Sequence, residues 1–388
     1  MSDPGSIRAE ERRQPVNLAP FGVGLGLFVL LFAVGNAIGG EPGQIMAASV
    51  NTLPFAVLAV LAYLGGERPN WAWVATALWL TLMVGGVSLI ALGLSLNVLA
   101  GGRSSDAGAL PALARADLAR LGLVGLGIMG SIASGALLIL PAARQALARI
   151  VPINPASFVH AVALVAVVTI GLIAVVPLVV LGAPPFLTLV EDLAGDAMGR
   201  DTAGLLRDQI YSLIWTIPAA MLAVGFGITR DLREALARLG LTRPTPRQAL
   251  IGLGLALLLA GAVQVIGMGI EWLWGLMGWP MTDEEAFDQL FAFAINPAGA
   301  VVIGISAGLG EELAVRGVLQ PRLGLWLSNL FFTSLHAFQY NWDALLIVFL
   351  VGVVCGLVRR RSSTSVAAIV HGGYNFTLIM LATLGVGS

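Results

Sequence analysis

The ionisable residues between positions 310 and 375 stand out because they lie within strongly apolar sequence. GEELAVRG contains Glu311, Glu312 and Arg316, LFFTSLHAF contains His336, and IVHGGYNF contains His371 and Asn375. An ionisable side chain inside a bilayer costs roughly 3 kcal/mol or more, so such groups need partners or a function. A carboxylate can take a proton from water, and imidazole and carboxamide groups can stabilise an oxyanion. These residue types favour hydrolysis.

Helical spacing indicates how these side chains would be presented. Glu312 and Arg316 are four residues apart and share a helix face, which predicts an ion pair. Glu311 is rotated by about 100° from Glu312, which leaves it free to act as a base. Phe332 precedes His336 by four residues, and His371 precedes Asn375 by four. We therefore expect three helices to surround one polar pocket.

The composition indicates the elements that carry these residues. Hydrophobic residues make up 57% of the 388 positions, charged residues only 11%, and the net charge is −1. This composition excludes an ordinary soluble domain and predicts an all-α, polytopic transmembrane bundle. No basic run interleaved with aromatic residues supports nucleic-acid binding.

Apolar runs of about 20 residues, the length that crosses a bilayer, predict about eleven spans. The first starts near Phe21 and ends in GNAIGG, and is read as a retained helix and not as a cleaved signal peptide. The others are expected at 45–65, 71–99, 121–141, 158–182, 209–229, 248–271, 298–319, 325–339, 343–358 and 364–382. Gly304 with Gly308, and Gly352 with Gly356, could let helices approach closely, although chance explains these spacings equally well.

Arginine placement predicts the topology. The arginines fall mainly on alternate loops, which the positive-inside rule assigns to the cytoplasm together with the N-terminus. We divide the chain into a disordered cytoplasmic N-terminus at 1–19, a multi-span membrane region of unknown role at 20–230, and a catalytic membrane domain at 231–388. Within the last, the stretch before Gly240 reads either as an amphipathic helix at the membrane surface or as an ordinary connector.

The sequence leaves the role of a metal open. Glu311, His336 and His371 could together ligate Zn²⁺, but the H-E-x-x-H signature is absent, so no metal is assigned and no cofactor is required. The only cysteine, Cys355, has no partner for a disulfide and is read as a packing residue.

The three motifs resemble those of the CPBP family, the membrane proteins named for CAAX prenyl proteases and bacteriocin processing. GEELAVRG, FTSLH and HGGYN match E-E-x-x-x-R, F-x-x-x-H and H-x-x-x-N/D in order and spacing, and the resemblance extends over about residues 230 to 382. Val315 departs from the pattern, since the family often has an aromatic residue before the arginine.

The resemblance implies an intramembrane endopeptidase. Glu311 would activate water, His336, His371 and Asn375 would assist, and Arg316 would hold Glu312, with Phe332 packing beside the site. The family has been described both as metallo- and as glutamate-dependent, and the second is favoured here. The expected substrate is a small peptide or a membrane protein, and the bacterial character of the sequence favours the cytoplasmic (inner) membrane.

Two other functions remain open. The same buried polar groups could form an ion path in a transporter, or the chain could be a non-catalytic membrane scaffold. Transporters commonly contain inverted repeats, and no strong internal repeat is visible in this sequence.

Overall fold

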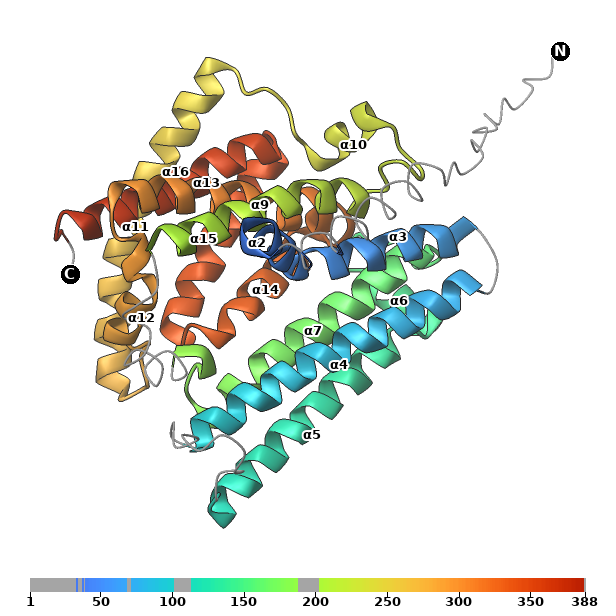
Figure 1. Cartoon of the computed structure of the whole chain (residues 1–388), viewed down its shortest axis with the longest axis horizontal. Helices are drawn as coiled ribbons and strands as arrows, with labels where there is room; N and C mark the ends of the chain where they lie inside the picture. The colour runs from blue at the N-terminus through green and yellow to red at the C-terminus, as the bar shows by residue number, and fades with distance from the viewer. Residues whose placement is uncertain are drawn as a thin grey trace.

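A computed structural model describes residues 39–67, 71–100, 113–187 and 202–386, together with the single positions 33 and 37. The described residues form helices and turns without any named strand, which confirms the all-α prediction (Figure 1). The expected N-terminus at 1–19 and almost all of the expected first span lie outside the described residues.

Seven helical segments of the described chain are long and apolar enough to cross a membrane, and one bent pair brings the number to eight. The seven are Ala72–Ala100, Arg115–Leu137, Phe158–Leu181, Pro246–Met277, Pro297–Phe338, Trp342–Arg361 and Thr364–Thr383. The bent pair joins Gly40–Asn51 to Leu53–Gly66 at 55°, where the sequence predicts a single span at 45–65. The structure thus confirms a polytopic helical protein.

Among the described residues the candidate spans number fewer than the expected eleven for identifiable reasons, the first being that the expected first span lies outside these residues. Helix α9 at Thr202–Ala223 carries Arg207, Asp208 and Gln209 and is not among the seven. The expected spans 298–319 and 325–339 are two arms of one helical run. Gly324, with φ 77° and ψ 174°, kinks this run, a conformation that glycine adopts without steric cost.

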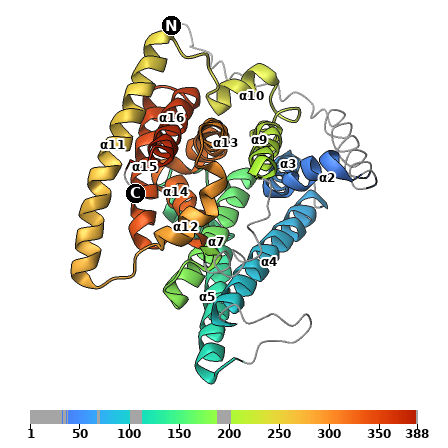
Figure 2. The same ribbon diagram turned by 60° about the vertical axis from the view of Figure 1, so that its left-hand side comes forward.

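The central helix α7 (Phe158–Leu181) packs against both the N-terminal and the C-terminal helices. Helices α3 (Leu53–Glu67), α4 (Trp71–Ala100) and α5 (Arg115–Leu137) lie beside α7, as Figures 1 and 2 show. A buried cluster then joins α7 to α14 (Gln320–Leu335) through Leu164, Ile170 and Phe331. The short α6 (Pro141–Leu147) connects α5 and α7.

The C-terminal half holds the candidate site. It contains α10 (Leu232–Leu239), α11 (Pro246–Met277), α12 (Glu284–Phe291), α13 (Pro297–Glu312), α15 (Trp342–Arg361) and α16 (Thr364–Thr383). Figure 2 shows α11 along the outer edge of this half, and α16 packs against both α11 and α13. Helix α10 ends at Gly240 as the sequence predicts, and its Leu239 is fully buried against α9 and the end of α13.

Glycines allow the backbones of α13 and α16 to touch. A Cβ atom at Gly308 would lie 2.5 Å from the Cα of Gly372, and one at Gly304 would lie 2.9 Å from the carbonyl oxygen of Gly372. Such distances are far below van der Waals contact, so any larger residue would push the helices apart. The close approach considered for Gly304 and Gly308 is therefore confirmed, and it sets the distance between the first and third motifs.

Candidate active site

The first motif lies where α13 changes into a π-helical turn. Helix α13 ends at Glu312, and the π-helical segment η3 covers Leu313–Leu319 before α14 begins. π-Helical turns often occur at functional sites because they redirect side chains within a continuous helix. Here Glu312 and Arg316 are both 1% exposed, and Nε of Arg316 lies 3.4 Å from Oε2 of Glu312. The structure thus contains the ion pair that the spacing predicts.

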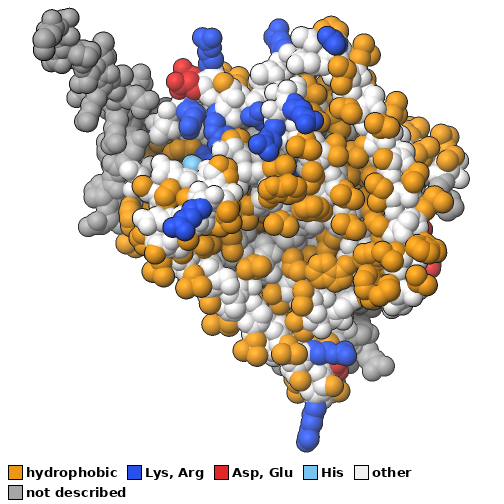
Figure 3. All heavy atoms as spheres, turned by 180° about the vertical axis from the view of Figure 1, so that it is seen from behind, with side chains coloured by type: hydrophobic (Ala, Val, Ile, Leu, Met, Phe, Trp, Pro, Cys, Tyr) orange, Lys and Arg blue, Asp and Glu red, His pale blue; other side chains and the backbone are white. Residues whose placement is uncertain are grey.

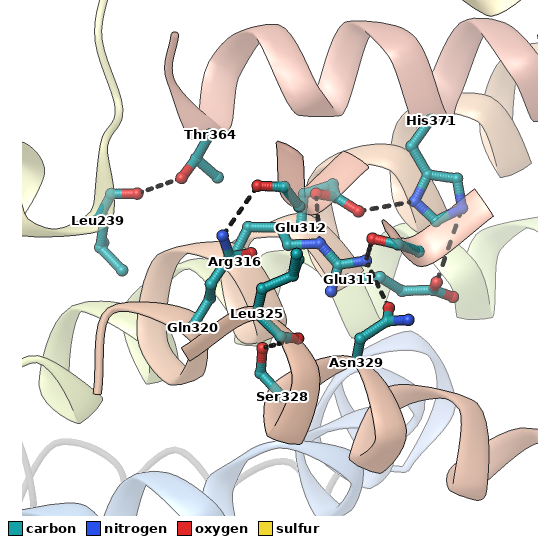
Figure 4. Close-up of polar contacts among 12 residues, drawn as sticks. Leu239, Glu311, Glu312, Arg316, Gln320, Leu325, Ser328, Asn329, Thr364 and His371 are labelled. Atoms are coloured by element: carbon teal, nitrogen blue, oxygen red, sulfur yellow. Dashed lines mark hydrogen bonds and ion pairs between the residues drawn. The ribbon is translucent and has the colours of Figure 1, made fainter. Parts of the chain in front are cut away.

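Glu312 also contacts the third motif, which the sequence does not predict. Nδ1 of His371 lies 3.1 Å from Oε1 of Glu312, and Nε2 of His371 lies 3.9 Å from Oε2 of Glu311. Because a carboxylate only accepts hydrogen bonds, Nδ1 must donate, and this fixes which nitrogen of the ring faces Glu311. Figure 4 shows Glu312 between Arg316 and His371.

Glu311 differs from its neighbour in exposure. Its side chain is 37% exposed, whereas that of Glu312 is 1% exposed and lies between two cationic or hydrogen-bonding groups. The adjacent carboxylates therefore occupy different environments, one open to small molecules and one enclosed. This difference suits one carboxylate to chemistry and the other to positioning.

The guanidinium of Arg316 is fixed by helix α15. Its Nη2 donates to the carbonyl oxygen of Gly352 at 2.8 Å, and Oδ1 of Asn329 lies 3.4 Å away. Asn329 in turn donates to the carbonyl oxygen of Phe349 at 2.9 Å. A side chain at Gly352 would lie only 2.0 Å from Oδ1 of Asn329, so this glycine makes room for the contact. The guanidinium of Arg316 thus contacts α14 and α15 in addition to Glu312.

Phe332 lies between the two histidines and the arginine. Its ring centroid lies 4.7 Å from that of His336 and 6.3 Å from that of His371, both in edge-on geometry. Cζ of Arg316 lies 5.2 Å from the same ring centroid, within range of a cation–π interaction. The ring of Phe332 therefore packs against three polar side chains of the site.

His336 is held by its own helix end. Its Nδ1 lies 2.9 Å from the carbonyl oxygen of Phe332, which can only accept, so Nδ1 carries the proton and Nε2 is available to another group. The ring of Tyr340 is stacked with the imidazole, with the ring centroids 5.9 Å apart. The ring of Phe332, which is close to both histidines, is the contact that connects His336 to His371.

Asn375 lies one turn beyond His371 in α16 and is half-buried. Within the described part of the chain it makes no hydrogen bond, so its carboxamide is available to a bound molecule. We expected Glu311, His336, His371 and Asn375 to line one pocket, but only some of them are in direct contact. Glu311 and His371 are neighbours, whereas His336 is linked to His371 through the ring of Phe332 and Asn375 follows His371 by one helical turn.

The groups that could hold a metal differ from the expected set. In the described residues, ligand atoms of Glu312, Cys355 and His371 all lie within 4.8 Å of one another. The set considered from the sequence was Glu311, His336 and His371. Glu312 already has Nε of Arg316 at 3.4 Å, and a guanidinium so close would repel a divalent cation. This donor set fits a metal ion poorly.

An apolar cavity of about 270 Å³ lies beside the first motif. It extends between α3, α7 and α9, and Ala314 and Val315, one turn after Glu311, form part of its wall. Alanines on three helices, among them Ala59, Ala166 and Ala220, create the space. An apolar side chain or alkyl group next to Glu311 would fit such a lining.

Asn329 and Gly372 were missed by sequence reasoning, and Gly352 was identified only as a glycine that could let helices approach closely. Asn329 and Gly352 hold Arg316, and Gly372 lets α16 approach α13. Asn329 is a polar residue within an apolar run, which is a signal that could have identified it. The role of Gly372 could not be separated from that of the many other glycines.

Comparison with known proteins agrees with this geometry. Residues 293–377 match the family described as Rce1-like, type II CAAX prenyl endopeptidase Rce1-like. The match contains all three motifs and is narrower than the region of resemblance given above. No match was found among curated proteins or solved structures. The resemblance to the CAAX protease family is thus confirmed for the segment that carries the motifs, since residues 293–377 are similar to the Rce1-like family.

Proposed function

We propose that the protein is an intramembrane endopeptidase in which Glu311 activates the attacking water. The observation that carries this proposal is the 3.9 Å separation between Oε2 of Glu311 and Nε2 of His371. One water molecule can lie within about 3 Å of two atoms so placed, the reach that general base catalysis requires. The family indicates proteolysis, and this pair offers the means.

The proposed reaction proceeds in two steps. Glu311 takes a proton from water while the water oxygen bonds to the peptide carbonyl carbon. The C–N bond then breaks, and the proton passes to the leaving amine, with His371 close enough to assist. Asn375 is proposed to donate its side-chain amide N–H to the oxyanion of the tetrahedral intermediate, and His336 to donate from Nε2 in its protonated, imidazolium form, because Nδ1 is already bonded to the carbonyl oxygen of Phe332.

Glu312 and Arg316 are proposed to act as positioning residues. Glu312 fixes the ring orientation of His371 through Nδ1, and Arg316 fixes Glu312. Neither residue needs to touch the substrate. Of the set Glu311, His336 and His371, only His371 belongs to the cluster of ligand atoms found among the described residues, and that cluster has Arg316 beside Glu312, so we propose a glutamate-dependent mechanism without a metal.

The substrate is proposed to be a peptide or membrane protein that presents an apolar group to the cavity beside Ala314. We place the enzyme in a bacterial cytoplasmic membrane with its N-terminus on the cytoplasmic side, as the arginine-rich loops predict.

The experiment compares membrane and secreted peptides from cells that carry the wild-type protein or Glu311→Gln. A peptide that accumulates uncleaved only with the variant identifies a substrate and supports the proposal. If Glu311→Gln, expressed in cells that lack the protein, restores every wild-type property, the protein acts as a scaffold instead.

A further inference from the structure

A second and larger cavity lies away from the candidate active site. It has a volume of about 720 Å³ and is formed by the Ala148–Pro152 loop, by residues 320, 321 and 323–327 around the kink, and by the end of α15. Its walls thus come from both halves of the protein. Pro152 packs so closely on Gly324 that a Cβ atom there would lie 2.8 Å from Cδ of the proline.

The charge of this cavity is entirely positive. Arg149, Arg359 and Arg360 line it, and no aspartate or glutamate does. Within the described part of the chain none of these arginines forms an ion pair, and the buried Nε of Arg359 has no hydrogen-bond partner. Gathered cations without counter-charges favour an anionic ligand.

The kink at Gly324 adds backbone donors to the same wall. Because Gly324 is not helical, Leu325, Trp326 and Leu327 form the first turn of the arm that follows, and all three line the cavity. The first N–H groups of a helix have no intrahelical acceptor, and the helix dipole is positive at this end. Phosphate groups commonly bind at such positions.

The rim of the cavity is apolar and faces outward. Ile150 is 82% exposed and Trp326 is 62% exposed, and the indole of Trp326 stacks on Phe349 at 6.4 Å. Tryptophan side chains are typical of the boundary between headgroups and acyl chains. A soluble anion would gain nothing from this rim, whereas a phospholipid would use both the basic interior and the apolar edge.

The position along the helices agrees with a headgroup site. The cavity adjoins the arginine run that ends α15, and Figure 3 shows basic side chains gathered mainly at one end of the molecule above a broad hydrophobic surface. Basic pockets between helices at this level are known sites for anionic lipid headgroups.

We propose that this cavity binds the phosphate headgroup of an anionic phospholipid, whose acyl chains pass over Ile150 and Trp326. The lipid would bridge the Ala148–Pro152 loop and the Rce1-like segment. Its binding is independent of whether Glu311 is catalytic.

The test uses the full-length protein, purified and delipidated in a neutral detergent. Phosphatidylglycerol and phosphatidylcholine with identical acyl chains are titrated separately, and bound lipid is counted by native mass spectrometry. We expect phosphatidylglycerol to bind selectively. Arg149→Gln with Arg360→Gln should weaken it by roughly twentyfold to thirtyfold, because each basic residue near an anionic headgroup contributes about a factor of five. Both side chains are exposed, so folding should be retained.

A matched control removes two charges elsewhere on the exposed basic surface, in Arg243→Gln with Arg247→Gln. The proposal predicts nearly unchanged binding there. Equal losses in both double variants, or equal binding of the two lipids, would overturn the site. Displacement of phosphatidylglycerol by millimolar glycerol 3-phosphate would show a site for soluble anions and would equally overturn the lipid assignment.

Discussion

Nδ1 of His371 donates a hydrogen bond to Oε1 of Glu312 over 3.1 Å, although 59 residues separate the two in the chain. The contact requires α13 and α16 to touch along Gly304, Gly308 and Gly372. It gives the two adjacent glutamates of the first motif different contacts with one imidazole. Glu312 orients the imidazole, and Glu311 faces its other nitrogen.

The first prediction concerns the buried ion pair. Arg316→Met should lower the free energy of unfolding by about 3 to 5 kcal/mol, because it leaves the carboxylate of Glu312 buried without a cation. Thermal unfolding in detergent measures this change. The double variant Arg316→Met with Glu312→Leu should recover only part of the loss, since two apolar residues can replace a buried pair but Nδ1 of His371 then loses its acceptor. Wild-type stability in the single variant would show that the pair contributes nothing.

The second prediction concerns the helix contact that brings the motifs together. Gly308→Val should separate α13 from α16, cost roughly 1 to 3 kcal/mol or more, and abolish cleavage. Activity and thermal stability are measured together. The matched control is Gly261→Val in α11, because a Cβ atom at Gly261 meets nothing within 4 Å. Similar effects of the two substitutions would mean that the close approach is unimportant.

The third prediction separates the mechanisms with and without metal. Cys355→Ala should leave cleavage within about twofold of wild type, because small changes in a packed core cost little when no ligand is lost. A strong chelator should also have no effect. Loss of activity in Cys355→Ala, together with chelator inhibition reversed by Zn²⁺, would instead assign a metal to Glu312, Cys355 and His371, the set whose ligand atoms cluster.

The fourth prediction concerns the ring that links the histidines. Phe332→Leu keeps an apolar side chain but removes the contacts with His336 and with Arg316. We expect a lower kcat with little change in KM, since the ring positions reacting groups and does not bind substrate. The kinetic constants of the purified variant check this. A raised KM with unchanged kcat would place Phe332 in substrate binding.

Sequence reasoning identified what depends on local spacing. Glu312 and Arg316 share a face in either an α-helix or a short π-helical turn, so their pairing was predictable. The contact between Glu312 and His371 was not, because it depends on which of 48 glycines lets two helices touch. Nor could hydropathy reveal that Gly324 kinks one continuous run, since the residues on both sides are apolar. Composition determined the fold class, whereas long-range packing determined the site.

The most direct test of the central claim is cleavage by purified Glu311→Gln. Glutamine keeps the size of the side chain but cannot accept the proton, so kcat should fall by roughly 10² to 10⁴-fold or more while the unfolding temperature is retained. Glu285→Gln, at an exposed position on α12, removes the same charge away from the site and should retain full activity. Undiminished cleavage by folded Glu311→Gln would contradict the account.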